Sequence, residues 1–419
     1  MPSYPLVRLY DGRMSSATPM TSEARQIMDL EREFLLQNYS RYPLVLERGE
    51  GCYVFDVDGN RYLDFIAGIG VNALGHAHPR IVQVIREQVG LLIHCSNLYY
   101  HRYQGALAKR LADVSGLQRS FFANSGTEAM EGALKMVRAH GNKINSEKFE
   151  ILSLENSFHG RTFGALSVTG QPKYRHDFEP LLAGVKFLPP NDVAALARAF
   201  DDRTAGIVIE WIQGEGGIFP VSVEYARRAR ELADRYNALL VFDEIQCGVG
   251  RPGTWFGYQL ASPVVLPDVM VAAKPLACGL PLGVIVANEK AAAAIGAGMH
   301  GSTFGGSALA CRVALEFFDI LDELLPSIQR VGDYFRARLM DLARRYSFIR
   351  EVRGCGLMIG LDMTVPGKQM VLDAQSRGLL INCTHDTVLR FLPPYIITEK
   401  EVDTAIKILD AVFAEQPSK

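Results

Sequence analysis

Two charged residues of this sequence each follow a short apolar run and could do chemistry together. Asp243 closes the run at residues 239–242, and Lys274 follows the run at 269–273. Runs of four to six apolar residues between turn signals are typical of buried strands. The sequence therefore predicts an acid and a lysine at the exits of two buried strands. They either pair with each other or hold an aromatic cofactor that carries a ring nitrogen and an aldehyde.

Strand-like runs alternate with helical patterns from residue 119 onward. Strands are predicted at residues 120–123, 151–154, 185–188, 206–210, 239–243, 269–272 and 284–287, and helices between several of them, for example at 223–236. This alternation predicts an α/β domain with a mainly parallel sheet. Ligands of such sheets bind beyond the carboxyl ends of the strands, where Asp243 and Lys274 fall.

The ends of the chain predict a smaller α+β domain. Helical spacing covers residues 22–39 and a long stretch at 307–346, and short strands and helices follow it. We expect an N-terminal arm and part of the small domain at residues 1–75, a large cofactor-binding domain at 76–310, and the C-terminal small domain at 311–419. The first 20 residues, which contain three prolines, are expected to form a loose arm.

The composition excludes several classes of partner. The 419 residues are 48% hydrophobic and 21% charged, which is globular, and the net charge of -2 predicts no nucleic-acid or membrane partner. No apolar run approaches the roughly 20 residues of a membrane span. The seven scattered cysteines contain no CxxC pair, so we expect reduced thiols in a cytoplasmic protein.

The segment Asn124-Ser125-Gly126-Thr127-Glu128 follows a predicted strand and opens a helix. Ser125 and Glu128 have the spacing of a capping box, so an ordinary helix cap is one interpretation. A glycine beside two hydroxyl residues at a helix N-terminus also suits an anion, because free N–H groups and the helix dipole point at it. The sequence leaves both interpretations open.

Other motifs carry weaker signals. The GxGxxG match at residues 248–253 is followed by a poor helix start, so it does not predict a dinucleotide site. His76 and His78 lie in a Gly/Pro turn with no nearby carboxylate or cysteine to complete a ligand set, so no metal is expected. Arg161 and Arg390 lie beside apolar segments and are expected to be partly buried, either against a structural acid or around a substrate carboxylate.

Several blocks in one order make the chain resemble a known family. They span residues 40 to 395 and include RGEGCYVFDVDGNRYLDF, FFANSGTEAMEGALK, FHGRTFGALSVTGQPKY, VFDEIQCGVGRPGTWF, AAKPLACGLPLG, HGSTFGG and RFLPP. The chain resembles the class-III aminotransferases that depend on pyridoxal 5'-phosphate, most closely their acetylornithine/ornithine aminotransferase group. This resemblance implies the aspartate-aminotransferase-like fold of pyridoxal-phosphate-dependent transferases.

The resemblance also implies roles for individual residues. Lys274 would bond to the cofactor aldehyde and later carry protons, and Asp243 would pair with the ring nitrogen. The other implied cofactor contacts are Gln246 at the ring hydroxyl, Phe158 on the ring face, Ser125, Gly126 and Thr127 at the phosphate, and His159 and Glu210 nearby. Ser302 and Thr303 would reach the phosphate of the neighbouring subunit, which implies a homodimer with shared active sites.

The activity implied is ping-pong transfer of the ω-amino group of N-acetylornithine, or a close ω-amino acid, to 2-oxoglutarate, giving a semialdehyde and glutamate. Arg390 would bind the α-carboxylate of glutamate, Glu215 would cover Arg390 when an ω-amino donor enters, and Arg161 would bind the other carboxylate. Ornithine, 4-aminobutyrate or succinylornithine aminotransferase, or a racemase or aminomutase with the same cofactor, remain alternatives.

Ala277 and Cys278 replace family glycines after Lys274 and could reshape the pocket. The loop at residues 68–71 is also expected to affect substrate choice.

Overall fold

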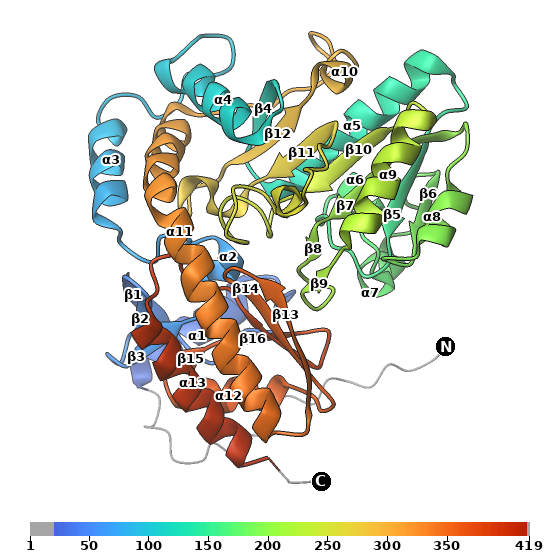
Figure 1. Ribbon diagram of the computed structural model, residues 1–419. Coiled ribbons are helices and arrows are strands. Elements are labelled where there is room, and N and C mark those ends of the chain that lie inside the picture. Colours follow the sequence, from blue (N-terminus) through green and yellow to red (C-terminus); the bar gives the residue numbers. More distant parts are fainter. Residues whose placement is uncertain (1–20, 417–419) are drawn as a thin grey trace.

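The structure is a computed structural model that describes residues 21–416 (Figure 1). The arm predicted at residues 1–20 lies outside the described residues. A seven-stranded sheet has the order β4-β12-β11-β10-β7-β5-β6. Its strands are β4 (Arg119–Ala123), β5 (Glu150–Leu154), β6 (Val185–Leu188), β7 (Thr204–Glu210), β10 (Leu239–Asp243), β11 (Val269–Ala272) and β12 (Gly283–Ala287). All neighbours pair in parallel except at β12, which is antiparallel to β4 and β11. The predicted mainly parallel sheet and its seven strands are confirmed.

The central strand β10 shows why both faces of this sheet are covered. Leu240 and Phe242 belong to one buried apolar cluster, and Leu239 and Val241 belong to another. Successive side chains of a strand point to opposite faces, so an unbroken apolar run needs cover on both. Helix α5 (Gly126–Ile144) covers one face, and α9 (Val223–Arg235) covers the other over β7 and β10.

Segments from both ends of the chain form the smaller α+β part. Strands β1 (Leu46–Glu50), β2 (Tyr53–Asp56) and β3 (Arg61–Asp64) are antiparallel, and β15 (Leu379–Leu380) pairs in parallel with β3. A second antiparallel sheet has the order β13-β14-β17-β16, made of β13 (Ile349–Cys355), β14 (Met358–Met363), β17 (Val388–Phe391) and β16 (Asn382–Thr384). Helices α12 (Lys368–Ser376) and α13 (Glu399–Ala414) pack on each other beside these strands.

The 38-residue helix α11 (Ala308–Arg345) connects the two parts. It packs against α3 (Pro79–Val89) and α4 (Arg102–Ser115), and also against β13 and α13 (Figure 1). The proposed domain boundary at 310/311 falls in its first turn, so this helix belongs to both parts by its contacts. The division at 75/76 and 310/311 remains a proposal.

The N-terminal helix is shorter than predicted. α1 spans Ser22–Phe34, and Leu35 has an extended backbone. The Gln37 side-chain amide donates to the carbonyl oxygens of Glu31 at 3.0 Å and of Leu35 at 2.7 Å. The Leu35 carbonyl oxygen is a group that a further helical turn would otherwise use, so the bond from Gln37 favours ending the helix, and the prediction of a helix to residue 39 is wrong.

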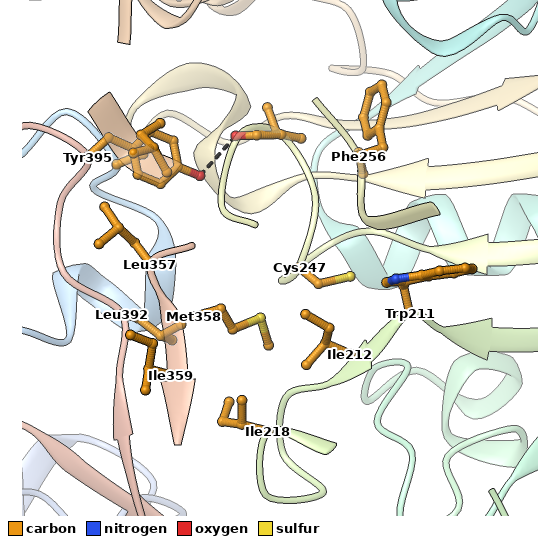
Figure 2. Close-up of a cluster of buried hydrophobic side chains, with 14 of the residues drawn as sticks. Trp211, Ile212, Ile218, Cys247, Phe256, Leu357, Met358, Ile359, Leu392 and Tyr395 are labelled. Carbon is orange, nitrogen blue, oxygen red and sulfur yellow. Dashed lines mark hydrogen bonds between the residues drawn. The ribbon is translucent and has the colours of Figure 1, made fainter. Parts of the chain in front are cut away.

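A buried apolar cluster joins the C-terminal sheet to the strand exits of the large sheet (Figure 2). The exit side supplies Trp211, Ile212, Ile218 and Cys247, and the C-terminal side supplies Leu357, Met358, Ile359, Leu392 and Tyr395. The Tyr395 hydroxyl donates to the Val249 carbonyl oxygen at 2.8 Å. Ile212 and Ile218 belong to a small hairpin, β8 (Ile212–Gln213) and β9 (Phe219–Pro220), which the cluster fixes against β14.

The cysteines, the helices and the GxGxxG segment can be compared with what the sequence predicted. All seven cysteines are free thiols. Within residues 21–416, no helix is both long enough and apolar enough to cross a membrane. The GxGxxG segment forms turns, in which the N–H of Gly253 donates to the Gly250 carbonyl oxygen at 3.0 Å, and it does not open an α-helix.

The contact between α11 and the β13–β14 turn makes a testable stability prediction. A Cβ atom at Gly332 would lie 2.3 Å from the Gly356 carbonyl oxygen, which is backbone and cannot rotate away. We expect Gly332→Ala to lower the free energy of unfolding by about 2 kcal/mol, although alanine is the better helix former. Denaturant unfolding followed by circular dichroism measures this change.

Gly105 in α4 is the matched control. It is also a helical glycine, but it is exposed and a Cβ atom there would meet nothing within 4 Å. Gly105→Ala should therefore raise the free energy of unfolding by about 0.5 to 1 kcal/mol. Equal effects of the two substitutions would contradict the close approach of α11 to the turn.

Candidate active site

A cavity of about 460 Å³ lies at the carboxyl ends of β4, β5, β7, β10 and β11. This size is typical of small-molecule sites, which range over roughly 300–1,000 Å³. Its lining contains Val71, Asn124, Ser125, Gly126, Thr127, Phe158, His159, Gly160, Arg161, Glu210, Glu215, Asp243, Ile245, Gln246, Ala273, Lys274, Gly279, Leu280, Pro281 and Leu282. Most residues predicted from the sequence therefore meet around one space.

Asp243 pairs with a histidine rather than with Lys274. One oxygen, Asp243 Oδ2, lies 2.7 Å from His159 Nδ1, and Oδ1 accepts the N–H of Ile245 at 3.0 Å. Burial would lower the pKa of His159, but the hydrogen bond and negative charge of Asp243 outweigh it and raise that pKa. His159 thus favours its protonated form and donates to a charged Asp243, which remains on the cavity wall.

Glu210 ends β7 in register with Asp243 on β10. Its carboxylate accepts the N–H groups of Phe158 at 2.9 Å and Gly214 at 3.2 Å. Burial raises the pKa of Glu210 to about 7, with the charge of His159 acting in the opposite direction and that of Asp243 adding to the rise. Two buried carboxylates therefore share one cationic neighbour, His159.

Lys274 follows β11 and begins a short 3-10 helix, Lys274–Ala277. Its ammonium group is desolvated by the surrounding protein, which lowers the pKa to about 8, although the negative charge of Glu215 opposes this shift. A lysine with such a pKa is partly neutral near physiological pH and can act as a nucleophile or a base.

The start of α5 forms a concave end of the cavity. The Ser125 hydroxyl accepts the Glu128 N–H at 3.2 Å, as the predicted cap requires. The Glu128 carboxylate does not return to Ser125 but accepts the Asn124 N–H at 2.7 Å, so the predicted capping box is only half formed. Gly126 and Thr127 begin the first turn, where backbone N–H groups have no partner within the helix and suit an anion.

Ser302 and Thr303 do not line the cavity as the described chain forms it. The Ser302 hydroxyl accepts from the Asn124 side-chain amide at 3.1 Å and from the Gly305 N–H at 3.0 Å. The loop that carries them therefore lies beside the α5 anion site of its own chain. The contact with a neighbouring subunit remains a prediction.

Arg390 lies on β17 and is fully buried; within the described chain it does not line the cavity itself but contacts two residues that do, Glu215 and Gln246. Its Nη1 lies 2.5 Å from Glu215 Oε1 and 3.2 Å from Gln246 Oε1, and its Nε donates to Asn382 Oδ1 at 3.2 Å. The Thr384 hydroxyl donates to the Glu215 carbonyl oxygen at 2.8 Å. Burial would raise the pKa of Glu215, but the charge and hydrogen bond of Arg390 lower it, so the pair is ionic.

Arg161 differs from the sequence prediction, which expected it to be partly buried. It is exposed at the rim of the cavity, because it lies in the loop between β5 and α6 (Phe163–Ser167) rather than against the core. Its guanidinium carbon lies 4.0 Å from the ring centroid of Tyr174 and 5.4 Å from that of Phe158. Phe158 itself lies on the cavity wall, half-buried.

Sequence reasoning missed several lining residues. Asn124, Gly160, Ile245 and Leu280 to Leu282 line the cavity, whereas Ala277 and Cys278, which were expected to reshape it, do not line it within the described chain. Cys278 packs instead against the large core cluster. The apolar run after Gly279 was the available signal, because it follows Lys274 within a few residues. Val71, from the loop expected to affect substrate choice, does line the cavity.

The lowered pKa of Lys274 can be tested directly. Only the neutral amine reacts with acylating reagents, so in protein stripped of any cofactor its acetylation rate should rise with pH with a midpoint near 8 and fall away below it. Peptide mass spectrometry measures this rate, with the exposed Lys109 followed in the same sample as a reference for the reagent. In Glu215→Gln, the Lys274 midpoint should fall further, because the opposing charge is gone.

The chain is similar to known proteins over nearly its whole length. The family model described as aminotransferase class-III matches residues 35–413. The acetylornithine aminotransferase of Methanocaldococcus jannaschii is 47% identical over 391 residues, which are 93% of this chain and 98% of that protein. That of Caldanaerobacter subterraneus subsp. tengcongensis is 46% identical over 389 residues, which are 92% of this chain and 98% of that protein.

Solved structures give the same family. The ornithine aminotransferase from Toxoplasma gondii ME49 superposes with a TM-score of 0.88 at 31% identity, covering 93% of this chain and 95% of that one. The N-acetylornithine aminotransferase from Stenotrophomonas maltophilia K279a superposes with a TM-score of 0.80 at 33% identity, covering 92% of this chain and 98% of that one. The chain belongs to the class-III aminotransferases, which are pyridoxal-phosphate-dependent transaminases.

Proposed function

We propose that this transaminase moves the ω-amino group of N-acetylornithine, or of a close ω-amino acid, to 2-oxoglutarate, and releases the semialdehyde and glutamate in a ping-pong cycle. The observation that carries this proposal is the placement of two arginines around the cavity that Lys274 lines, one on its rim and one directly behind the lining residue Glu215. Arg390 is buried and covered by Glu215, and Arg161 is exposed at the rim. A site that serves two carboxylated substrates in turn needs such separate cations.

Pyridoxal 5'-phosphate is the cofactor of the family, and the cavity suits it at three points. The first turn of α5 offers N–H groups and the Ser125 and Thr127 hydroxyls for the phosphate, Asp243 offers a carboxylate for the ring nitrogen, and Lys274 offers an amine for the aldehyde. Gly126 lets the start of α5 pack closely against the lining residue Ile245, because a Cβ atom there would lie 2.8 Å from that side chain. When bound, the cofactor supplies an electron-withdrawing ring that takes up the electron pair released at the substrate carbon.

The residues around Asp243 prepare it for this role. His159, whose pKa is raised by Asp243, fixes one oxygen of that carboxylate, and a carboxylate partner favours a protonated ring nitrogen. Phe158 offers a ring face and Gln246 a side-chain amide on the same cavity wall. We propose that these residues hold the ring. Glu210, whose pKa is raised to about 7, would gain or lose a proton as the charge of its neighbours His159 and Asp243 changes.

Lys274 moves the proton. With cofactor and substrate bound, the neutral amine of Lys274 would take the proton from the substrate carbon and, as an ammonium group, would give it back. A pKa of about 8 gives it a workable balance of base and acid near physiological pH. The α-carboxylate of glutamate would bind Arg390 after Glu215 turns away, and Glu215 would cover Arg390 while the ω-amino donor is bound.

We also propose a homodimer with shared active sites. Apolar side chains near the Ser302 loop are exposed in the single chain, with Leu98 at 83%, Tyr99 at 70% and Phe304 at 65% of their full exposure. A patch of this kind supports a protein contact. We further propose a cytoplasmic location, which the seven free thiols support.

A donor panel tests the function. The purified enzyme is given 2-oxoglutarate with N-acetylornithine, ornithine, N-succinylornithine or 4-aminobutyrate, and glutamate formation is measured. The highest kcat/KM should belong to N-acetylornithine. A clear preference for another donor would assign the enzyme to that substrate, and failure of every donor would leave racemase or aminomutase chemistry, which a chirality or isomer assay detects.

Arg390→Ala should separate the two half-reactions. Loss of a buried carboxylate partner costs about 2 to 5 kcal/mol, so we expect kcat/KM for glutamate to fall about 100-fold, while that for the ω-amino donor falls less than about tenfold. Rapid mixing with each substrate alone, followed by the absorbance of the bound cofactor, measures both constants.

Glu215→Gln is the matched control for this prediction. It removes the acid that covers Arg390 but leaves the arginine in place. Glutamate should therefore still react well, and the ω-amino donor should be disfavoured. If Arg390→Ala left the glutamate half-reaction intact, the proposed carboxylate site would be wrong.

A further inference from the structure

Arg161 is an exposed arginine to which the proposed function assigns a substrate carboxylate. Within residues 21–416, its guanidinium group takes part in no ion pair, and only its backbone N–H is hydrogen-bonded, to the Thr127 hydroxyl at 3.2 Å. An exposed arginine side chain samples many rotamers, and fixing it on binding lowers affinity. A carboxylate site at this position therefore needs another group that holds the side chain in place.

Tyr174 holds it through its aromatic face. The guanidinium carbon of Arg161 lies 4.0 Å from the Tyr174 ring centroid, well inside the roughly 6 Å range of a cation–π contact. The ring of Phe158 lies further away, at 5.4 Å. Arg161 therefore rests mainly on Tyr174, which leaves the edge of its guanidinium fork available to a carboxylate.

The Tyr174 ring is itself fixed to the loop that carries Arg161. It meets the Phe158 ring edge-on, with centroids 5.7 Å apart and planes at 81°. Its backbone N–H donates to the Gln171 carbonyl oxygen at 3.1 Å, at the start of α7 (Pro172–Arg175). The buried side chain of Gln171 donates to the carbonyl oxygen of Asn156 at 3.2 Å, which anchors α7 to the exit of β5.

We propose that Tyr174 is a positioning residue that sets the orientation of Arg161 and thereby the preference for amino donors with a carboxylate at the rim. This inference rests on the proposed function, in which Arg161 binds that carboxylate. Tyr174 does not line the cavity in the described chain, so it acts through Arg161. Its removal should weaken binding of the carboxylate end and leave the proton transfers at Lys274 unchanged.

The test uses Tyr174→Leu, which removes the aromatic face, and Tyr174→Phe, which keeps it. Phe187→Leu is the matched control. The guanidinium carbon of Arg175, which lies on α7 like Tyr174, is 4.1 Å from the Phe187 ring centroid, so this substitution also removes an arginine–aromatic contact. Neither Phe187 nor Arg175 lines the cavity within residues 21–416. KM and kcat are measured on each holoenzyme with N-acetylornithine and with 1,4-diaminobutane, which has no carboxylate. Binding of glutarate, a dicarboxylate that does not react, is measured by calorimetry.

In Tyr174→Leu, we expect KM for N-acetylornithine and the Kd of glutarate to rise about threefold to tenfold, with kcat unchanged and KM for 1,4-diaminobutane unchanged. Tyr174→Phe should restore both constants, and Phe187→Leu should resemble the parent enzyme. Equal rises in KM for both amines, or an equal effect of Phe187→Leu, would overturn the proposal.

Arg161→Ala separates this inference from the function on which it rests. If Arg161→Ala weakens glutarate binding but Tyr174→Leu does not, only the role of Tyr174 is wrong. If Arg161→Ala changes neither glutarate binding nor KM for N-acetylornithine, the carboxylate role of Arg161 is wrong, and the positioning role falls with it. Thermal unfolding of each variant shows whether the fold is intact.

Discussion

Two buried carboxylates at adjacent strand exits set the main electrostatic constraint of this structure. Asp243 and Glu210 end β10 and β7 in register, and strands lie about 4.8 Å apart, so the two acids would repel each other if both were ionised. His159 resolves the conflict by pairing with Asp243, while burial raises the pKa of Glu210. The result is an Asp243 carboxylate that is paired with His159 on the cavity wall, next to a Glu210 that can hold a proton.

The second requirement of the site is tight packing between the C-terminal sheet and the strand exits of the large sheet. Arg390 belongs to β17, but its partners Glu215 and Gln246 belong to the large-sheet side. The cluster in Figure 2 fills the space between the two sides with buried apolar groups, and Thr384 bonds the backbone of Glu215 directly. Because Thr384 holds the backbone of Glu215, the proposed uncovering of Arg390 would need only a turn of the Glu215 side chain and would leave the cation in place.

Local patterns predicted the sheet and the positions of Asp243 and Lys274 at strand ends, because an apolar run that ends in a charged residue can be recognised from neighbouring residues alone. Asp243 and Lys274 both proved to line one cavity. The His159 contact could not be predicted this way, because the two residues are 84 positions apart and their strands, β5 and β10, are separated by β7. The end of α1 was missed because Gln37 satisfies its carbonyl groups from outside the helical pattern.

The two arginines show that apolar neighbours in the sequence do not by themselves predict whether a side chain is buried. Both lie beside apolar residues, yet Arg390 is buried in a strand and Arg161 is exposed in a loop. A buried arginine without substrate needs an acid, and Glu215 is that acid, so its site must open before an anion binds. An exposed arginine needs no counter-ion, but it needs an orienting contact, and an aromatic face supplies one without competing for the substrate carboxylate. Their different surroundings therefore support the proposal that Arg390 takes a substrate carboxylate only after Glu215 has moved, whereas Arg161 is open to one at the rim.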